Sequence, residues 1–451
     1  MNRLAKLSLR SRALVASFAL AGAAIVGCVA SARAADPPVF SPLPKIDDRH
    51  VLSLGIRKVV GKHLTLYTDL PASPEVDELP AVFDLAVPQW CEYFQVDRGW
   101  LARWQIIACV MTNKDRFQQA GLLPANVPPF LHGFQIGRQV WLLEQPSSYY
   151  RRHLLLHEGT HAFMNEVLGG AGPPWYAEGM AELFGTHRWH EGKLTLRYMP
   201  RTREEVPEWG RVKIVRDDQA AGRGLSLDEV MKYGPRAHLE TGPYGWCWAA
   251  TTFLDSHPRS QAKFRELRRD VKDSSLEFSR RLFQSLRTDW RDLAEEWQLL
   301  VAEMDYGYDV ARAAIERKPA APLPAKGLTV RIAANRGWQS SGIQLAADKK
   351  YRIRAAGRYQ IAAEPQPWWC EPGGVTIRYY LKRPLGMVLA SVTDDEQPLK
   401  ETTPLATPEP IGLDRTLTFR RAGTLYLRIN ESPAGLADNS GEIQVRVEEV
   451  P

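Results

Sequence analysis

The spacing of apolar and polar residues changes character part-way along this chain. In the first part, short apolar runs typical of strands alternate with segments whose apolar residues recur every three or four positions, as on one face of a helix. Strands are predicted at residues 63–68, 105–111 and 139–143, and helices at residues 75–94 and 115–120. Further along, only the helical period continues, at residues 226–233, 244–256, 260–271, 276–286 and 289–303. The pattern predicts an α+β domain with a helical second half.

Beyond residue 327 the pattern changes to short strands with alternating apolar and polar positions. These strands are predicted at residues 328–333, 343–345, 351–356, 375–381, 416–419, 424–429 and 442–447. Their number and spacing predict an all-β sandwich. The preceding segment is rich in Pro and Ala, which is typical of a semi-rigid, exposed linker. We therefore predict a first domain at 37–317, a linker at 318–327 and a second domain at 328–451.

Residues 1–34 have the composition of a signal peptide. A basic start is followed by a run of small apolar residues at 13–29, and Ala32-Arg33-Ala34 fits the cleavage rule. This predicts export to the periplasm or the cell exterior. Ile25-Val26-Gly27-Cys28 also resembles a bacterial lipobox, so a soluble form and a form anchored through an acylated Cys28 both remain open. No later stretch approaches about twenty apolar residues, so no transmembrane segment is expected in the mature chain.

Net charge gives little support to a nucleic-acid partner. The formal charge of +6 comes mostly from the leader, which holds Arg3, Lys6, Arg10, Arg12 and Arg33 and no acidic residue. The basic residues between 259 and 291 are interleaved with acidic ones, as on solvated helix faces. We therefore expect no nucleic-acid binding.

Four cysteines would remain after removal of the leader, namely Cys91, Cys109, Cys247 and Cys370. Their spacing has no Cys-x-x-Cys metal pattern. Cys91 and Cys109 either form a bridge, as an oxidising compartment allows, or stay as two buried thiols.

His157-Glu158-Gly159-Thr160-His161 places two imidazoles and a carboxylate on one predicted helix. Residues four apart share a helix face, so His157 and His161 can bind one metal ion, while Glu158 can reach a water molecule on it as general base. Residues 149–156 run into the motif without Gly or Pro, and residues 162–168 continue the helix to Gly169-Gly170, which is typical of a C-cap. The motif is therefore expected in mid-helix.

A second helix is predicted directly after this one, opened by Pro173-Pro174. It carries two carboxylates four residues apart. Glu178 can complete a His2Glu zinc site that leaves the fourth position to water, and Glu182 can accept the spare N–H of a ligand histidine.

The paired helices resemble those of the gluzincin metallopeptidases, especially bacterial families with the pattern Trp-x-x-Glu-Gly-x-Ala-Glu and an aromatic residue close behind. The matching residues are Trp175, Glu178, Gly179, Ala181, Glu182 and Phe184. The resemblance covers roughly residues 60–260 and implies a zincin-like fold with bound Zn²⁺. It also implies that residues 139–143 form the sheet edge that pairs with extended substrate. By the same resemblance Tyr244 is a candidate donor to the developing oxyanion, the alternative being packing beside Trp246 and Trp248.

Three other histidines lie near the motif. His153 is one turn before His157 but would overshoot a metal held by His157 and His161, so we expect a solvated or capped side chain. His187 and His190 follow the second helix in a predicted turn and are expected at the surface.

The C-terminal domain resembles the calcium-dependent galactose-binding lectins of bacteria and their jelly-roll relatives. The matching segments are 337–343, 353–357, 425–431 and 438–441. Carried over from that family, Glu431, Asp438 and Asn439 are candidate Ca²⁺ ligands. The family has Asp where this chain has Glu431, and the loop is longer here by a residue or two. A sandwich that only packs on the first domain or on a partner is the alternative.

Together these features predict a secreted zinc metallopeptidase that hydrolyses peptide bonds of a peptide or protein substrate, with an accessory domain that binds carbohydrate. A glycosylated substrate would engage both domains. Two alternatives use the same residues differently. One is a non-catalytic, exported carbohydrate-binding protein with a peptidase-like scaffold, and the other is a zinc amidase acting on cell-wall material.

Overall fold

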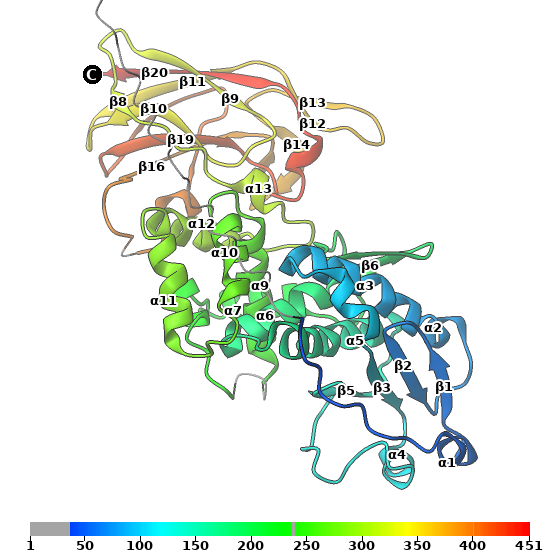
Figure 1. Cartoon of the computed structure of the whole chain (residues 1–451). Coiled ribbons are helices and arrows are strands. Elements are labelled where there is room, and N and C mark those ends of the chain that lie inside the picture. Colours follow the sequence, from blue (N-terminus) through cyan, green and yellow to red (C-terminus); the bar gives the residue numbers. More distant parts are fainter. Residues whose placement is uncertain (1–36, 237–239, 400) are drawn as a thin grey trace, which may run out of the picture. The chain divides into compact units, whose positions relative to one another are not determined.

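The computed structural model describes residues 37–236, 240–399 and 401–451. The predicted leader 1–34 and Cys28 lie outside the described residues, so both remain predictions. Within the described residues, the model has helices and several sheets in its first part and is rich in strands toward its C-terminus (Figure 1).

A five-stranded sheet forms the base of the first part, in the order β1-β2-β3-β5-β4. Its strands are β1 (Arg57–Val60), β2 (Leu64–Thr68), β3 (Ile106–Met111), β4 (Gly133–Ile136) and β5 (Gln139–Leu143). β3 is parallel to β2 and to β5, whereas β1 and β4 run antiparallel to their neighbours. The edge strands are therefore β1 and β4, and the prediction that residues 139–143 form an edge is wrong because β5 lies between β3 and β4. The sequence gives little sign of β4, because its short stretch is only partly buried.

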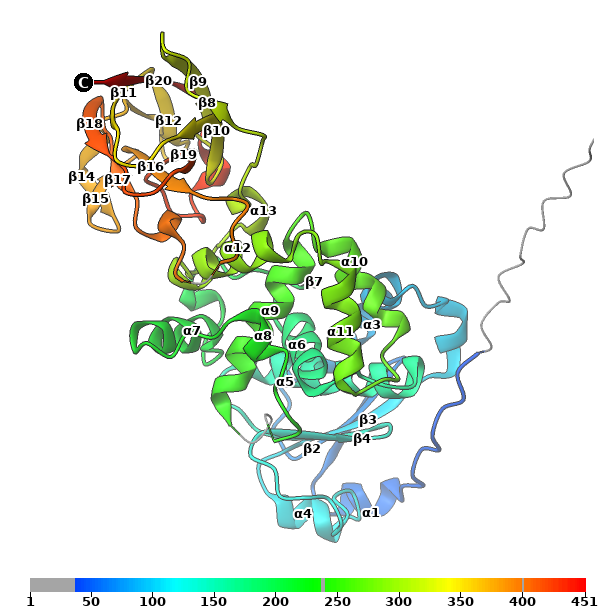
Figure 2. The same cartoon turned by 90° about the vertical axis from the view of Figure 1, so that its left-hand side faces the viewer.

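The two faces of this sheet are covered by different helices (Figure 2). Ile106, Ala108 and Val110 of β3 belong to the core that includes α3 (Leu79–Phe94) and α5 (Ser148–Phe163). The alternate residues of β3 belong to a second core with α1 (Asp48–Ser53) and α4 (Lys114–Gln119). Burial on both faces explains why β3 is a continuous apolar run in the sequence.

Helices and a hairpin of β6 (His187–His190) and β7 (Lys193–Leu196) make up most of the rest of the first part. The helices are α6 (Pro174–Gly185), α7 (Arg211–Ala220), α8 (Leu227–Val230), α9 (Thr241–Ser256), α10 (Gln261–Glu266), α11 (Leu276–Ser285), α12 (Trp290–Ala302) and α13 (Val310–Ala313). Most were expected from the sequence, but α7 and α13 were not. The helix predicted at 75–94 is divided into α2 (Pro74–Asp77) and α3 at Glu78, just before Pro80.

Two glycines allow the helices around the candidate site to approach closely. A Cβ atom on Gly159 of α5 would lie 2.5 Å from Cε2 of Phe83, and one on Gly179 of α6 would lie 2.3 Å from Cγ2 of Thr251. Real Cβ atoms do not approach so closely, so α5 packs on α3, and α6 on α9, only with glycine at these positions. Both glycines stand beside site residues, which fixes the positions of Glu158 and Glu178.

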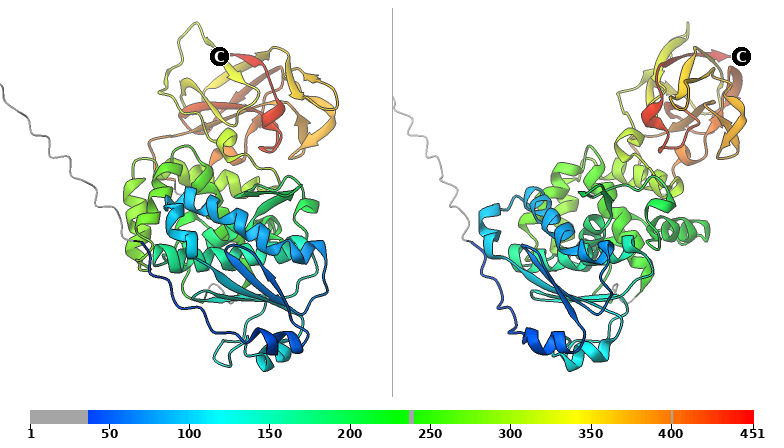
Figure 3. Two further views of the ribbon diagram at one scale, coloured as in Figure 1. Left: turned by 45° about the vertical axis from the view of Figure 1, so that its right-hand side comes forward. Right: turned by 90° about the vertical axis from the view of Figure 1, so that its right-hand side faces the viewer.

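The two larger sheets of the C-terminal part enclose one apolar core. The first has the order β17-β16-β19-β10-β8 and the second the order β18-β11-β20-β9. Their strands are β8 (Ala321–Pro322), β9 (Leu328–Ala333), β10 (Gln339–Leu345), β11 (Lys350–Ala356), β16 (Val388–Thr393), β17 (Glu409–Pro410), β18 (Asp414–Thr418), β19 (Gly423–Ile429) and β20 (Glu442–Val450). Inward residues of both sheets, such as Ile353 and Leu427, share the core. Figure 3 shows this region in yellow to red.

Ion pairs and apolar contacts connect α12 to the β-rich part. Arg428 of β19 donates to both carboxylate oxygens of Glu303 at 2.9 and 3.0 Å. Leu299 of α12 packs in a small apolar cluster with Trp338 and Tyr426. Within the predicted linker, Ala321–Pro322 pairs with β10 as strand β8. The segment is therefore partly built into the sheet, and the domain boundary at 318–327 stays a prediction.

Cys91, Cys109, Cys247 and Cys370 are all free and buried, so of the two alternatives for Cys91 and Cys109 the structure has the thiols. Burial raises the pKa of Cys91 to about 11, which keeps this thiol protonated. Among the described residues, no helix has the length and apolar character needed to cross a membrane.

Candidate metal centre

Helix α5 presents the His157–His161 motif from a fixed position. The helix begins at Ser147, whose side chain accepts a hydrogen bond from the amide of Tyr150. After Phe163 it continues as a π-helical turn, Met164–Leu168, and ends at Gly169 with φ of 78°. The predicted mid-helix placement and glycine C-cap are both present. Leu155 and Leu156 are buried in the core, which fixes the rotation of the helix.

Helix α6 brings Glu178 to the motif. It starts at Pro174, as expected, and packs against α5. Its apolar side chains Trp175, Met180 and Phe184 belong to the main core. Glu178 and Glu182 therefore lie on the side of the helix that faces α5, one turn apart.

Three side-chain atoms converge in the arrangement that a tetrahedral metal ion requires. Nε2 of His157 lies 3.2 Å from Nε2 of His161, and Oε2 of Glu178 lies 3.4 and 3.6 Å from these two atoms. Ligands about 2.0–2.1 Å from a tetrahedral zinc ion are about 3.3 Å apart, so the spacing fits. Oε2 of Glu178 is also buried and has no hydrogen-bond partner among the described residues. His157, His161 and Glu178 could hold a metal ion.

Glu158 lies beside this group and beside the edge strand β4. Its side chain is buried, and burial raises the pKa of its carboxyl group although His157 and His161 act in the opposite direction. A Cβ atom on Gly133 of β4 would lie 2.6 Å from Oε1 of Glu158. Only glycine at this position lets the strand pass so close to the carboxylate.

Glu182 lies behind His157, on the side away from Glu178. Its Oε1 is 3.3 Å from Nδ1 of His157, and its Oε2 is 3.4 Å from Nε2 of His153. Arg211 donates two hydrogen bonds to the same carboxylate, so both of its oxygen atoms already have a partner. Burial alone would raise the pKa of Glu182, but Arg211 and His153 hold it well below its ordinary value. An ionised Glu182 can accept the Nδ1 proton of His157 and so leave Nε2 free for a metal.

A second group, His153, His157 and Glu182, also has ligand atoms close together. Arg211 makes this group a poor metal site, because a cation is already bound to both oxygens of Glu182. The structural role of the group is to orient His157.

Tyr244 lies in the first turn of α9, close to the centre. Its ring centroid is 5.9 Å from that of His157, and the guanidinium of Arg211 lies 5.5 Å from the Tyr244 ring. Burial raises the pKa of its hydroxyl, with Glu178 acting in the same direction, so the group stays protonated. Trp246 and Trp248 instead have ring contacts with Trp297 and Trp209.

Two of the three additional histidines are not where the sequence suggested. His153 was expected to be solvated or capped, but it is fully buried between Tyr150 and Glu182. His187 was expected at the surface, but it is buried in β6 (His187–His190) and stacks on Tyr149 at 4.6 Å. Burial lowers the pKa of His187 to about 3. His190 is exposed, as expected.

The candidate calcium ligands lie after β19. Glu431 is buried and accepts a hydrogen bond from the amide of Ser432 at 2.9 Å. Asp438 is exposed, and its carboxylate accepts from the amide of Ala363 at 3.2 Å. Asn439 is buried, and its Oδ1 has no hydrogen-bond partner among the described residues. Burial, with a contribution from Asp438, raises the pKa of Glu431 to about 7.

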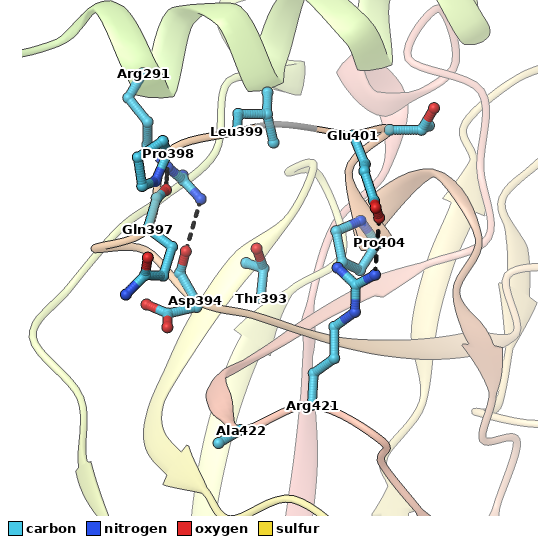
Figure 4. A pocket seen from close by; sticks show the side chains of 11 residues that line it. Arg291, Thr393, Asp394, Gln397, Pro398, Leu399, Glu401, Pro404, Arg421 and Ala422 are labelled. Carbon is cyan, nitrogen blue, oxygen red and sulfur yellow. Dashed lines mark hydrogen bonds and ion pairs between the residues drawn. The ribbon is translucent and has the colours of Figure 1, made fainter.

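A separate cavity of about 380 Å³ lies between α12 and loops of the β-rich part (Figure 4). Arg291 donates to the carbonyl of Asp394 at 2.8 Å on one side of it, and Arg421 pairs with Glu401 at 3.1 Å on the other. It shares no residue with the histidine and glutamate cluster.

Comparisons with known proteins show no family for this chain. No family model matches the chain, so the gluzincin resemblance remains an expectation. No curated protein matches either. A solved structure described as "EclA N-terminal domain; PllA-like lectin" matches 28% of this chain and 98% of its own, with 18% identity and a TM-score of 0.22. At that TM-score the likeness carries no argument about fold or function.

Proposed function

We propose that the chain is a zinc-dependent peptidase of gluzincin type, with His157, His161 and Glu178 as the protein ligands of Zn²⁺. The observation that carries the proposal is the spacing of 3.2, 3.4 and 3.6 Å among their three ligand atoms. Two histidines and one carboxylate, with room for a fourth ligand, are typical of catalytic rather than structural zinc sites. When bound, zinc acidifies a water molecule and polarises a carbonyl oxygen.

The residues around the metal ligands then have distinct roles. Glu158 takes the proton of the attacking water on its carboxylate and returns it to the nitrogen of the leaving amine. Burial raises the pKa of Glu158, which makes its carboxylate a stronger base toward the proton of the water. Tyr244, protonated and close to His157, donates a hydrogen bond to the carbonyl oxygen as negative charge develops there.

A peptide is the substrate that the surroundings favour. β4 pairs with β5 along one side only, so its other side can accept main-chain hydrogen bonds from an extended peptide. Gly133 of this strand lies directly beside Glu158, so a peptide paired there would have its backbone near the proposed base. A zinc amidase with cell-wall material as substrate would use the same metal ligands, but it would not need the free side of β4.

Metal removal and return tests the proposal. The purified chain is treated with a chelator, then titrated with Zn²⁺ while a peptide library is digested and analysed by mass spectrometry. We expect cleavage to disappear with the metal and to return at about one equivalent of zinc. Zinc binding without cleavage of any peptide would reject the peptidase and leave the amidase or a non-catalytic protein.

A second proposal concerns the β-rich part, in which Glu431, Asp438 and Asn439 would bind Ca²⁺ and, through it, carbohydrate. It is supported by the buried, unpartnered Oδ1 of Asn439 and by the buried carboxyl of Glu431, since oxygen ligands of this kind suit calcium. Calcium at millimolar concentration should raise the melting temperature, and the triple alanine variant should lose that shift. Retention on a galactose resin, lost in the same variant, would be the test of sugar binding.

A further inference from the structure

A hairpin in the β-rich part exposes apolar side chains on a strand that has only one neighbour. β14 (Val375–Tyr380) pairs with β15 (Arg383–Leu385) in a two-stranded sheet. Ile377 and Tyr379 of β14 are 85% and 58% exposed, and the pairing with β15 shifts register between Val375 and Tyr379. Leu381, in the turn that follows, is 49% exposed.

The hairpin is held firmly in spite of this exposure. The side-chain amide of Asn430 donates to the carbonyl groups of Tyr380, Arg383 and Pro384 at 2.8, 2.9 and 3.0 Å. The hydroxyl of Tyr380 donates to Glu303 at 3.1 Å. One side of the hairpin is thus bonded to the body of the protein, and Ile377 and Tyr379 remain in solvent.

The turn at its tip has an unfavourable backbone for its sequence. Leu381 and Lys382 have φ of 45° and 64°, and they join the paired residues Tyr380 and Arg383. A two-residue turn of this kind normally contains Asn and Gly, because a branched side chain is strained at positive φ. The structure nevertheless places an apolar and a basic side chain at the tip.

The charge of the hairpin has a single sign. Between Glu371 and Asp394 the sequence has no acidic residue, but it has Arg378, Lys382 and Arg383. Arg383 donates to the carbonyl of Pro408, whereas Arg378 and Lys382 are exposed and have no hydrogen bond or salt bridge to another described residue. Apolar side chains, a tyrosine and two cations without a salt bridge to another described residue therefore lie together, and Arg378 is near enough to Glu431 to act on the pKa of its carboxyl.

We propose that this hairpin docks on the surface of an anionic phospholipid membrane. Ile377 and Leu381 would enter the boundary of the acyl chains, Tyr379 would lie at the level of the headgroups, and Arg378 and Lys382 would meet the lipid phosphates. A second copy of the chain is a poorer occupant, because a two-fold contact would bring the same cations face to face. The proposal goes beyond the peptidase function, since cleavage of soluble peptides does not require the hairpin.

Vesicle flotation tests this docking with residues 37–451, which omit the apolar leader. Vesicles of phosphatidylglycerol and of phosphatidylcholine are compared at low and high salt. We expect binding to the anionic vesicles only, reversed by salt. The variant Arg378→Ser/Lys382→Ser should bind about fivefold more weakly for each charge removed. Ile377→Ser/Leu381→Asn should bind at least about tenfold more weakly, and Asn tolerates the positive φ at 381.

Two control variants remove the same number of charged or apolar side chains from parts of the surface outside the hairpin. Lys318→Ser/Lys326→Ser lowers the net charge equally, and Leu52→Ser/Val60→Ser removes apolar side chains that are 54% and 63% exposed. Both controls should bind as the unmodified chain does. Absence of binding to anionic vesicles, or equal loss in the control variants, would overturn the proposal. So would a dimer in solution that the hairpin variants dissociate without any vesicle binding, because the surface would then be a self-association site.

Discussion

Arg211 donates two hydrogen bonds to Glu182, from Nε to Oε2 at 2.9 Å and from Nη2 to Oε1 at 2.7 Å. Both side chains are buried, and Oε1 of Glu182 is also 3.3 Å from Nδ1 of His157. Arg211 thus fixes the carboxylate that orients a candidate metal ligand. The guanidinium group of Arg211 also lies near the ring of Tyr244, so Arg211 contacts both Glu182 and Tyr244.

Replacement of Arg211 is expected to weaken the metal site without removing a ligand. Arg211→Met leaves Glu182 as a buried carboxylate without its cation, free to move away from His157. Zinc affinity, measured by competition with a chromogenic chelator, should fall about ten- to a hundredfold. Arg211→Lys keeps the positive charge but cannot donate two parallel hydrogen bonds to Glu182. Its zinc affinity should fall less than that of Arg211→Met.

A control for this variant removes a similar ion pair far from the cluster. Arg428→Met breaks the buried pair with Glu303 and should destabilise the fold by about 3–5 kcal/mol. Its zinc affinity should match that of the unmodified chain. Equal loss of affinity in both variants would mean that Arg211 acts through general stability alone.

Gly133→Ala tests the contact between the edge strand and Glu158. The added Cβ would lie 2.6 Å from Oε1 of Glu158, so either the carboxylate or β4 must move. We expect full zinc content with at least about a tenfold loss of peptide cleavage, because a displaced base transfers the proton poorly. Gly234→Ala is the control, since a Cβ there meets nothing within 4 Å. Unchanged cleavage by Gly133→Ala would contradict the proposed position of the base.

Residues of the candidate site that lie close together in the sequence can be predicted better than residues that packing brings in from distant segments. His157 and His161 stand out because their spacing places them on one helix face, Glu178 stands out on the helix that Pro173-Pro174 opens directly afterwards, and Gly169 marks the end of the first helix. Arg211 could not be found, because α7 is weakly amphipathic and its partner Glu182 is distant in the chain. β4 was missed for a related reason, since a short and partly exposed strand has no clear alternation. Burial of His153 and His187 depends on packing that no local pattern records.

The third ligand can be separated from its neighbours by metal analysis. Glu178→Ala should lose zinc outright, since it removes one of three protein ligands. His187→Ala should keep it, because this side chain stacks on Tyr149 and its Nδ1 bonds to the carbonyl of Gly185. The reverse result, an empty site in His187→Ala and a filled one in Glu178→Ala, would show that the ligand set is wrong.

Glu431 should make the stability of the calcium-free protein depend on pH. Its pKa is about 7 in the folded chain, against an ordinary value of 4.5, because of burial. The folded protein keeps a proton that the unfolded chain releases, so stability should fall as the pH rises from about 4.5 to about 7. Glu431→Gln should therefore be more stable than the unmodified chain at pH 8, by up to about 3 kcal/mol, and equal to it at pH 4.

Urea unfolding of both proteins at the two pH values measures this difference. If Glu431→Gln raised the free energy of unfolding equally at pH 4 and pH 8, the carboxyl group of Glu431 would not change its protonation on folding. Addition of calcium at pH 8 should narrow the difference if the ion binds Glu431, because the metal compensates the buried charge.

We propose Glu158 as the base at a zinc ion held by His157, His161 and Glu178. The most direct test of this proposal is peptide cleavage by Glu158→Gln at matched zinc content, with both proteins analysed for metal before the assay. We expect about one zinc per chain in each protein and loss of cleavage in the variant, because an amide cannot accept the proton. Equal cleavage by Glu158→Gln and the unmodified chain would contradict the proposal.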